Sequence, residues 1–332
     1  MNYTVDIYTT SLAAQPVMVD NILYISDYFT IRAFDPLTGR QLWNWTMDEP
    51  HRIDFCPPAV GGGVLYIGDG VGWFHAINST TGEHLWSQII GTNIWNPAAV
   101  ASDSTVVMGS NDKIVRRFHP NGTQIWQFTL PEPMSSPPSF NEAEDTVYVI
   151  AGCFKMFALV WESGKLIWSQ QFDWDDQGNC AAGGVALGHN GTLFYGDQSG
   201  YLRAYTSNGT LLWKYQFLDS QGAMMGSVAV SPIDNVIYAA VLEALFATWP
   251  NGTVRFQHKP QQNYFCNGAT LTRNGTVWYT CGSAALAVDP NDGHTIFNFT
   301  DPQTMYYAGP TGGCNCPPPF SVPRCAVACL LY

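Results

Sequence analysis

Short runs of β-branched and aromatic residues alternate with Gly, Asn and Asp along the whole chain. In one stretch these runs cover 58–60, 64–67, 74–77 and 84–87, and a Gly-rich turn at 61–63 separates the first two. Runs of three to six such residues, bounded by turn residues, are typical of short antiparallel strands. The pattern therefore predicts four strands in about forty residues, named a to d in chain order.

The four-strand unit is repeated. A turn glycine is followed four residues later by an aromatic residue, and successive aromatics lie 40 to 45 residues apart. The pairs are Gly39/Trp43, Gly82/Trp86, Gly122/Trp126, Gly164/Trp168, Gly209/Trp213, Gly252/Phe256 and Gly293/Phe297. An Ala precedes the Gly by five or six residues in six units, and Arg117 replaces it in the third. Such repetition predicts an all-β protein, a β-propeller of four-stranded blades. A two-sheet sandwich, the alternative, needs no regular repeat.

The two ends of the chain extend the count of blades. Residues 1–8 align with a strand d, although the seventh unit has its own strand d at 295–299. A partner for the extra strand is available at 306–312, which resembles a strand a. We expect eight blades: seven full repeats over 9–302 and a last blade built from both termini, with the Cys- and Pro-rich tail 303–332 as a partial blade or clamp. Seven blades with an added outer strand are the alternative.

The segments AFDPLTGRQLW at 33–43 and AINSTTGEHLW at 76–86 resemble the tryptophan-docking motif of pyrroloquinoline-quinone (PQQ)-type propellers. The resemblance covers roughly 9–302 and implies that each ring packs against a neighbouring blade. The third, fifth and sixth units shorten the turn to Asn-Gly-Thr, and the last two aromatics are Phe. Many functions share one fold, so the motif specifies an architecture and not a chemistry.

Members of this family are either quinoprotein dehydrogenases or non-catalytic scaffolds, such as bacterial outer-membrane assembly lipoproteins. The resemblance implies that an enzyme would carry an adjacent Cys-Cys disulfide, a catalytic Asp and calcium ligands. This chain has no adjacent cysteines, the nearest being Cys314 and Cys316, and it lacks large insertions. We therefore expect no enzyme and no quinone. A quinoprotein-like dehydrogenase, or a propeller that binds a small ligand or carbohydrate in its central channel, is the alternative.

Other catalytic and metal signals are weak in the sequence. The seven His residues show no metal-ligand spacing, and no nucleophile elbow or phosphate loop occurs. The acidic stretch 173–179 starts like an EF-hand loop, but Gly184 stands where the bidentate Glu belongs. We expect no catalytic residue and no metal site, with calcium at this loop as the alternative.

Composition narrows the class of partner. The chain has 332 residues, with 26 Asp and Glu against 14 Lys and Arg and a net charge of -12. Nucleic acid is excluded as a partner, because binding a polyanion needs a basic face. The 46% of hydrophobic residues excludes intrinsic disorder. The longest apolar run, 236–249, contains Glu243 and is shorter than the about 20 residues of a membrane span.

Asn-x-Ser/Thr sequons are frequent. They lie at Asn2, Asn44, Asn78, Asn121, Asn190, Asn208, Asn251, Asn274 and Asn298. Of six Asn-Gly pairs, five continue with Thr, which a turn does not require. The sequons therefore predict N-linked glycans and a eukaryotic secretory route. No signal peptide precedes Met1, so we expect a processed or incomplete chain.

The sequons also predict which face is free. Most of them fall in a–b or c–d turns, which emerge on one face of a propeller, and Asn2, Asn44 and Asn298 fall on strand d at the rim. The opposite face, made of b–c turns and d–a loops, has none. Its candidate contact residues are Tyr28, Phe29, Trp73, Lys113, Phe154 and Glu243 in b–c turns and Phe55, Trp95, Met225 and Tyr264 in d–a loops. We expect a secreted structural or interaction subunit of a matrix, surface coat or appendage, whose partners are other extracellular proteins or copies of itself.

Cysteines of the propeller body gather on the same sequon-free face. Cys153 and Cys281 fall in b–c turns, and Cys180 and Cys266 fall at the entry to strand a, so the pairs Cys153–Cys180 and Cys266–Cys281 are plausible disulfides of an oxidising compartment. Free buried thiols are the alternative. Cys56 and four tail cysteines make an odd number, which indicates a free thiol or a bond to another chain. Pairing within the tail stays open: Cys314, Cys316, Cys325 and Cys329.

Overall fold

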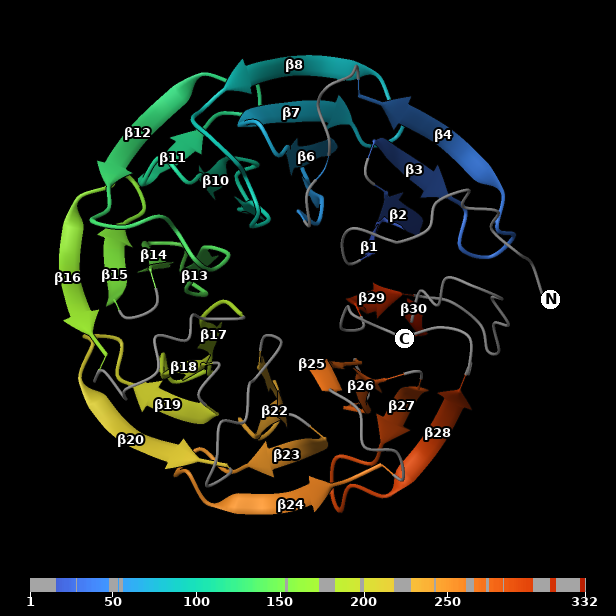
Figure 1. Cartoon of the computed structure of the whole chain (residues 1–332), viewed down its shortest axis with the longest axis vertical. Coiled ribbons are helices and arrows are strands. Elements are labelled where there is room, and N and C mark those ends of the chain that lie inside the picture. The colour runs from blue at the N-terminus through green and yellow to red at the C-terminus, as the bar shows by residue number, and fades with distance from the viewer. Residues whose placement is uncertain are drawn as a thin grey trace.

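A computed structural model of the whole chain shows seven four-stranded antiparallel sheets arranged as blades around a ring (Figure 1). It describes residues 16–27, 29–47, 53, 56–152, 155–172, 183–197, 200–217, 228–241, 243–260, 266–272, 275–282 and 284–300, and the backbone of 311–314 and 329–331. The propeller predicted from the repeat is thereby confirmed. No helix in the described part of the chain is long and apolar enough to span a membrane.

Blades 1 to 4 follow one another along the chain. Their strands are β1 (Val17–Val19), β2 (Ile22–Ser26), β3 (Thr30–Phe34) and β4 (Gln41–Thr46); β5 (Ala59–Gly61), β6 (Val64–Gly68), β7 (Trp73–Asn78) and β8 (His84–Ile89); β9 (Ala99–Val100), β10 (Val106–Gly109), β11 (Ile114–Phe118) and β12 (Gln124–Thr129); and β13 (Ser139–Phe140), β14 (Thr146–Ala151), β15 (Lys155–Val160) and β16 (Leu166–Gln171).

Blades 5 to 7 continue the series. Their strands are β17 (Ala186–Leu187), β18 (Leu193–Gly196), β19 (Tyr201–Tyr205) and β20 (Leu211–Gln216); β21 (Ala229–Val230), β22 (Ile237–Val241), β23 (Ala244–Thr248) and β24 (Val254–His258); and β25 (Cys266–Leu271), β26 (Val277–Cys281), β27 (Ala284–Val288) and β28 (Thr295–Thr300). In every blade strand a is innermost and strand d forms the rim (Figure 1). Because neighbours are antiparallel, a–b and c–d turns emerge on one face, and b–c turns and d–a loops on the other.

The space between blade 7 and blade 1 holds a smaller sheet. Strand β29 (Thr311–Cys314) lies beside β1 and β25 and pairs in parallel with β30 (Cys329–Leu331) (Figure 1). Seven four-stranded blades match the alternative count and correct our preference for eight, because this pair is parallel and two-stranded where a blade is an antiparallel meander. The strand expected at 1–8 lies outside the described residues.

The spacing of the repeated Ala, Gly and aromatic residue has a local cause. In each blade the residue at the Ala position lies directly opposite the aromatic of strand d, as Ala33 lies opposite Trp43, and the strand register shifts immediately afterwards. In six blades this residue is Ala, whose methyl side chain leaves room for the ring across the hairpin. The shift is a β-bulge, which accommodates one extra residue and bends the strand.

The aromatic rings join successive blades. The Trp43 ring lies against Gly82 of the next blade, where an added Cβ would come within 2.8 Å of the indole, and the φ of +76° at this residue also favours glycine. The same contact recurs through Gly293, which lies on Phe256. Each indole also donates a hydrogen bond to a carbonyl of the next c–d turn: Trp43 to Ser79 (2.9 Å), Trp86 to Pro120 (2.7 Å), Trp126 to Trp161 (2.7 Å), Trp168 to Ser207 (2.9 Å) and Trp213 to Pro250 (2.8 Å). The implied docking is confirmed.

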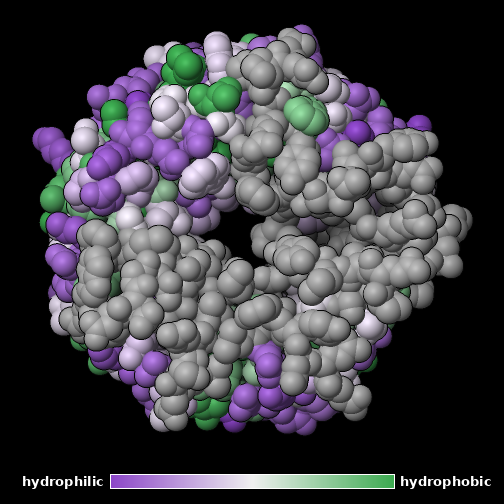
Figure 2. Space-filling view, in the orientation of Figure 1, coloured by the Kyte–Doolittle hydropathy of each residue, from purple (hydrophilic) through white to green (hydrophobic). Residues whose placement is uncertain are grey.

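Strands b and c supply most of the core between blades. Almost every described residue of β6, β10, β14, β18 and β22 is buried. The innermost strands carry no charged residue within the described part of the chain. In the space-filling view the ring is hollowed at its centre (Figure 2).

Candidate interaction surface

Four b–c turns on the sequon-free face are organised by an aspartate. Asp27, Asp69, Asp112 and Asp197 lie in blades 1, 2, 3 and 5, and the Asp69 side chain is completely buried. Asp69 Oδ1 accepts hydrogen bonds from the backbone N–H groups of Val71 (3.0 Å) and Trp73 (2.7 Å). Each carboxylate thus fixes the backbone of its own turn, as such short acidic side chains do in turns.

Each of these aspartates faces a basic residue of strand c, directly before the repeated Ala position: Arg32, His75, Arg116 and Arg203. The Asp112 carboxylate lies 2.6 Å from Arg116 Nη2. Burial acts to raise the pKa of Asp112, but hydrogen bonds from Arg116 and Ser110 outweigh it and the pKa is lowered. Sequence analysis missed these pairs; a basic residue before the Ala, with an Asp four to six residues upstream, was the available signal.

The remaining three blades fill the same position of strand c with an apolar residue. Blade 4 has Phe157, blade 6 has Phe246 and blade 7 has Leu286, and all three are buried. A buried cation without a partner would be costly. The b–c turns of these blades therefore have no need of an aspartate.

Three large apolar side chains are exposed on the sequon-free face of the first three blades. Phe29 is 41% exposed in the b–c turn of blade 1, and Trp95 is 52% exposed in the loop that leads to blade 3. Both were predicted contact residues. Val71, in the b–c turn of blade 2, is 45% exposed and was missed. Trp73 is only half-buried at the start of β7.

The two predicted charged contacts are engaged within the chain. Lys113 Nζ lies 3.2 Å from Glu132, and Glu243 lies 2.8 Å from Lys259 Nζ. Both pairs are substantially exposed, so each contributes little to stability.

Hydrophilic side chains predominate over blade 3 on the visible face (Figure 2). The other predicted contacts lie outside the described residues: Tyr28, Phe55, Phe154, Met225 and Tyr264.

Backbone hydrogen bonds hold the loop that carries Trp95. The Ile94 N–H donates to the Asp69 carbonyl at 2.9 Å, and the Asn111 N–H donates to the carbonyls of Thr92 and Asn93 at 3.2 Å. The loop is therefore bonded to the b–c turns of both blades that it connects. Trp95 is presented from a fixed backbone.

Cysteines on this face are only partly described. Cys266 and Cys281 lie opposite each other in β25 and β26 and form a disulfide. Cys56 is a free buried thiol, and burial raises its pKa to about 12. A bond of the odd cysteine to another chain stays a prediction. The described residues do not include Cys153, Cys180, Cys316 and Cys325, and the side chains of Cys314 and Cys329 are not described either.

The opposite face carries the sequon turns. Asn78, Asn121, Asn190, Asn208 and Asn251 lie at its c–d and a–b turns, whereas Asn44 and Asn298 are exposed on the outer strands β4 and β28. Asn251 Oδ1 accepts hydrogen bonds from the Thr253 N–H (3.0 Å) and hydroxyl (2.7 Å). The third sequon residue therefore has a structural use in this turn, contrary to the expectation that a turn does not require it. Asn2 and Asn274 lie outside the described residues.

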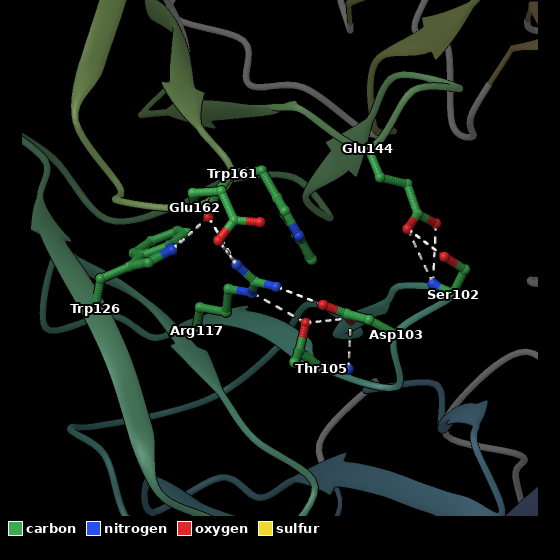
Figure 3. A network of polar contacts seen from close by, with 8 residues as sticks. All are labelled: Ser102, Asp103, Thr105, Arg117, Trp126, Glu144, Trp161 and Glu162. Carbon is green, nitrogen blue, oxygen red and sulfur yellow. Dashed lines mark hydrogen bonds and ion pairs between the residues drawn. The ribbon is translucent and has the colours of Figure 1, made fainter.

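Arg117 forms the centre of a polar network on the sequon-bearing face, between blades 3 and 4 (Figure 3). It is buried, and it donates from Nε to Thr105 Oγ1 (2.9 Å), from Nη2 to Asp103 (2.6 Å) and from Nη1 to the Trp161 carbonyl (3.0 Å). Its guanidinium also stacks 3.9 Å from the centre of the Trp161 ring. Partial burial acts to raise the pKa of Asp103, but Thr105 and Arg117 outweigh it and the pKa is lowered.

A second contact joins the same two blades nearby. Glu144 accepts hydrogen bonds from the Ser102 N–H (2.9 Å) and hydroxyl (2.6 Å), across the two a–b turns (Figure 3). Arg117 was recognised as a departure from the repeated Ala, and the structure shows its purpose. The long side chain passes the docked Trp126 and reaches the next blade, so the network works as a structural clamp.

One group of potential metal ligands occurs among the described side chains. Asp289, Asp292 and His294 lie close together in the c–d turn of blade 7. His294 Nδ1 lies 2.7 Å from Asp292, whose hydrogen bond raises the pKa of the imidazole. Both groups are exposed, and they form an ordinary surface ion pair. The predicted calcium alternative at 173–179 lies outside the described residues.

Comparison with known proteins places this architecture among relatives of different function. Residues 27–181 match the family described as outer membrane protein assembly factor BamB. The resemblance to PQQ-type propeller repeats is thereby confirmed. An outer membrane protein assembly factor BamB from Burkholderia pseudomallei is 28% identical over 134 residues, which are 40% of this chain and 34% of that protein.

Two further similarities belong to enzymes. A tetrathionate hydrolase from Acidithiobacillus ferrooxidans is 23% identical over 272 residues, 75% of this chain and 53% of that protein. The matched part of the chain thus spans about a third of the first of these curated relatives and about half of the second. The solved structure of a europium-containing methanol dehydrogenase superposes with a TM-score of 0.75 at 14% identity, over 93% of this chain and 81% of that one. This likeness shows the fold alone.

Proposed function

We propose that the chain is a non-enzymatic propeller scaffold that binds a partner protein through its b–c/d–a face. The observation that carries this proposal is the set of exposed apolar residues Phe29, Val71 and Trp95 on three successive blades. Exposed apolar groups gathered on one face mark interaction sites more often than single ones do. The fixed loop backbone supports the same role, since a preorganised contact loses less entropy on binding.

The described inner strands support a scaffold over a channel enzyme. A ligand site needs a few convergent polar groups in an apolar cavity. None of the described residues of the inner strands is charged. Addition of PQQ and calcium tests the enzymatic alternative: a quinone absorbance band or dehydrogenase activity would overturn the proposal, and neither is expected.

The proposed setting is extracellular, in a matrix, surface coat or appendage. The sequons support N-glycosylation of the a–b/c–d face and of the rim, which would leave the b–c/d–a face free. The name of the BamB relatives, outer membrane protein assembly factor, supports a role in assembly outside the cytoplasm. Treatment of the native protein with an endoglycosidase tests this part, and a loss of mass at several of the sequons is expected.

The proposal that the sequon-free face binds the partner is tested with a photo-crosslinking residue placed either at Trp95 or at Ile233. Ile233 is a matched control, because it is 73% exposed and lies in an a–b turn on the opposite face. In the native assembly we expect cross-links to a neighbouring protein from position 95 and none from position 233. Cross-links from position 233 alone would place the contact on the opposite, sequon-bearing face and overturn the proposal.

A further inference from the structure

Blade 2 departs from the other blades that carry an aspartate in its b–c turn. Its strand c places His75 where blades 1, 3 and 5 place Arg32, Arg116 and Arg203. His75 is 7% exposed, and its Nε2 lies 3.7 Å from Oδ2 of the fully buried Asp69. That nitrogen has no hydrogen-bond partner in the structure. The carboxylate can only accept a proton, so it favours the imidazole tautomer that carries hydrogen on Nε2.

The other nitrogen of His75 faces a serine. His75 lies directly opposite Ser87 of the outer strand, and His75 Nδ1 is 2.7 Å from Ser87 Oγ. With hydrogen on Nε2, Nδ1 is an acceptor and the Ser87 hydroxyl donates to it. A second imidazole reaches the same oxygen from the solvent side, since His84 Nε2 lies 2.5 Å from Ser87 Oγ. Hydrogen-bonding distances thus join His75, Ser87 and His84, and the Asp69 carboxylate lies 3.7 Å beyond His75 Nε2.

This geometry is the one that activates a hydroxyl. A serine is a weak nucleophile until an adjacent base accepts its proton and a third group orients that base. Here His75 is the base, and Asp69, which is itself held by two backbone N–H groups, is the positioning residue. Ser87 is partly exposed on the rim. We propose that Ser87 is a base-activated nucleophile that accepts an acyl group from an ester.

The step balances without a cofactor. Ser87 Oγ attacks the ester carbonyl carbon while its proton moves to His75 Nδ1, and the imidazolium is stabilised by Asp69. The bond between the carbonyl carbon and the alcohol oxygen breaks, and the departing alkoxide takes the proton from His75. The products are an acylated serine and a free alcohol.

The surroundings indicate an apolar acyl group. Trp45 of blade 1 packs against both imidazoles, with ring centres 5.2 Å from His75 and 6.1 Å from His84. Ile89 lies two residues beyond Ser87, on the same side of the strand, and is 64% exposed. An acyl chain bound to Ser87 would lie along this apolar surface. None of the exposed residues Phe29, Val71 and Trp95, which carry the proposed scaffold function, belongs to this reactive group.

The chain contains a matched control serine. Ser169 occupies the same position of strand d in blade 4, where it lies opposite Phe157 and is also partly exposed. It therefore shares the backbone setting of Ser87 without the facing imidazole. A serine-directed fluorophosphonate probe, followed by peptide mass spectrometry, compares the two sites in one sample. A general base contributes about 10² to 10⁴ in rate, so Ser87 should be labelled at least about a hundredfold faster than Ser169.

Three variants sharpen the test. His75→Arg installs the residue that three other blades carry, so the fold is retained while the base is removed, and labelling of Ser87 should fall to that of Ser169. Asp69→Asn keeps the oxygen that binds the turn but removes the charge that stabilises the imidazolium, so labelling of Ser87 should become slower while the fold is retained. Ser169→Ala should change nothing. Labelling of Ser87 no faster than that of Ser169, or undiminished in His75→Arg, would overturn the proposal.

Discussion

The junction between blades 5 and 6 and the junction between blades 6 and 7 join neighbours with different chemistry. In the first, the Trp213 indole donates 2.8 Å to the Pro250 carbonyl, and its ring lies on Gly252. In the second, Phe256 lies on Gly293 in the same way but has no donor. The carbonyl of Pro290 instead accepts a hydrogen bond from the Tyr238 hydroxyl at 3.3 Å.

The second junction also has polar contacts on either side of its ring. His258 Nδ1 lies 2.5 Å from the Tyr279 hydroxyl, and its Nε2 lies 2.9 Å from Thr295 Oγ1. Arg255 donates to Asn291 at 3.1 Å. Packing of a ring on a glycine is therefore the common requirement of a junction. The hydrogen bond of the indole is replaceable, because neighbouring side chains can supply donors to the same turn.

Removal of a docking ring should have the largest effect. Trp213→Ala is expected to lower the free energy of unfolding by about 3 kcal/mol, because it deletes the packed indole and its hydrogen bond. Phe256→Ala should cost a similar amount at the other junction. Denaturant titration measures both. A loss below about 1 kcal/mol at either position would show that the ring is not the common requirement.

A side chain that fills the space under a docking ring should cause the next largest loss of stability. Gly293→Ala is expected to cost about 2 kcal/mol, because φ is +77° and the new Cβ would lie 2.5 Å from the Phe256 ring. Gly63→Ala is the matched control, since φ is +78° there and nothing lies within 4 Å of the added Cβ. Thermal denaturation should show a smaller loss for the control. Equal losses would attribute the whole effect to backbone conformation.

Loss of a single hydroxyl donor should lower the free energy of unfolding by less than either of these changes. Tyr238→Phe is expected to lower the free energy of unfolding by about 1 kcal/mol, because the Pro290 carbonyl loses its donor. Tyr24→Phe in blade 1 should cost less, since the Ser79 carbonyl that binds Tyr24 keeps its bond from Trp43. Chemical denaturation of the two variants in parallel gives the comparison. A larger loss for Tyr24→Phe would contradict the replaceable-donor interpretation.

The smallest expected effect is a pH dependence confined to the junction of blades 6 and 7. Burial lowers the pKa of His258, so the folded state favours the neutral imidazole. The contribution of this group is therefore complete above the unfolded pKa of about 6.5 and is lost as the pH falls through the folded value. The melting temperature of His258→Gln should fall less than that of the parent over this range. A parallel decline in both proteins would exclude His258 as the cause.

The sequence by itself determined the blade and its docking ring. Ala33 and Trp43 face each other within one hairpin, and Gly82 must have a positive φ, so both requirements are local and recur at a fixed period. The sequence also placed Phe29 and Trp95 on the sequon-free face, because the direction of each turn follows from the order of the strands.

Only the tertiary structure decided how the ring is completed and which polar groups meet. The sheet between blades 7 and 1 depends on the sum of all blade angles, which no local pattern encodes. The reach of Arg117 to Trp161 crosses between blades. The meeting of His75 with Ser87 depends on strand register after a bulge, and a slip of one residue would turn every side chain to the other side. Such contacts are set by packing over long sequence separations, whereas turn and strand preferences are set by neighbours in the chain.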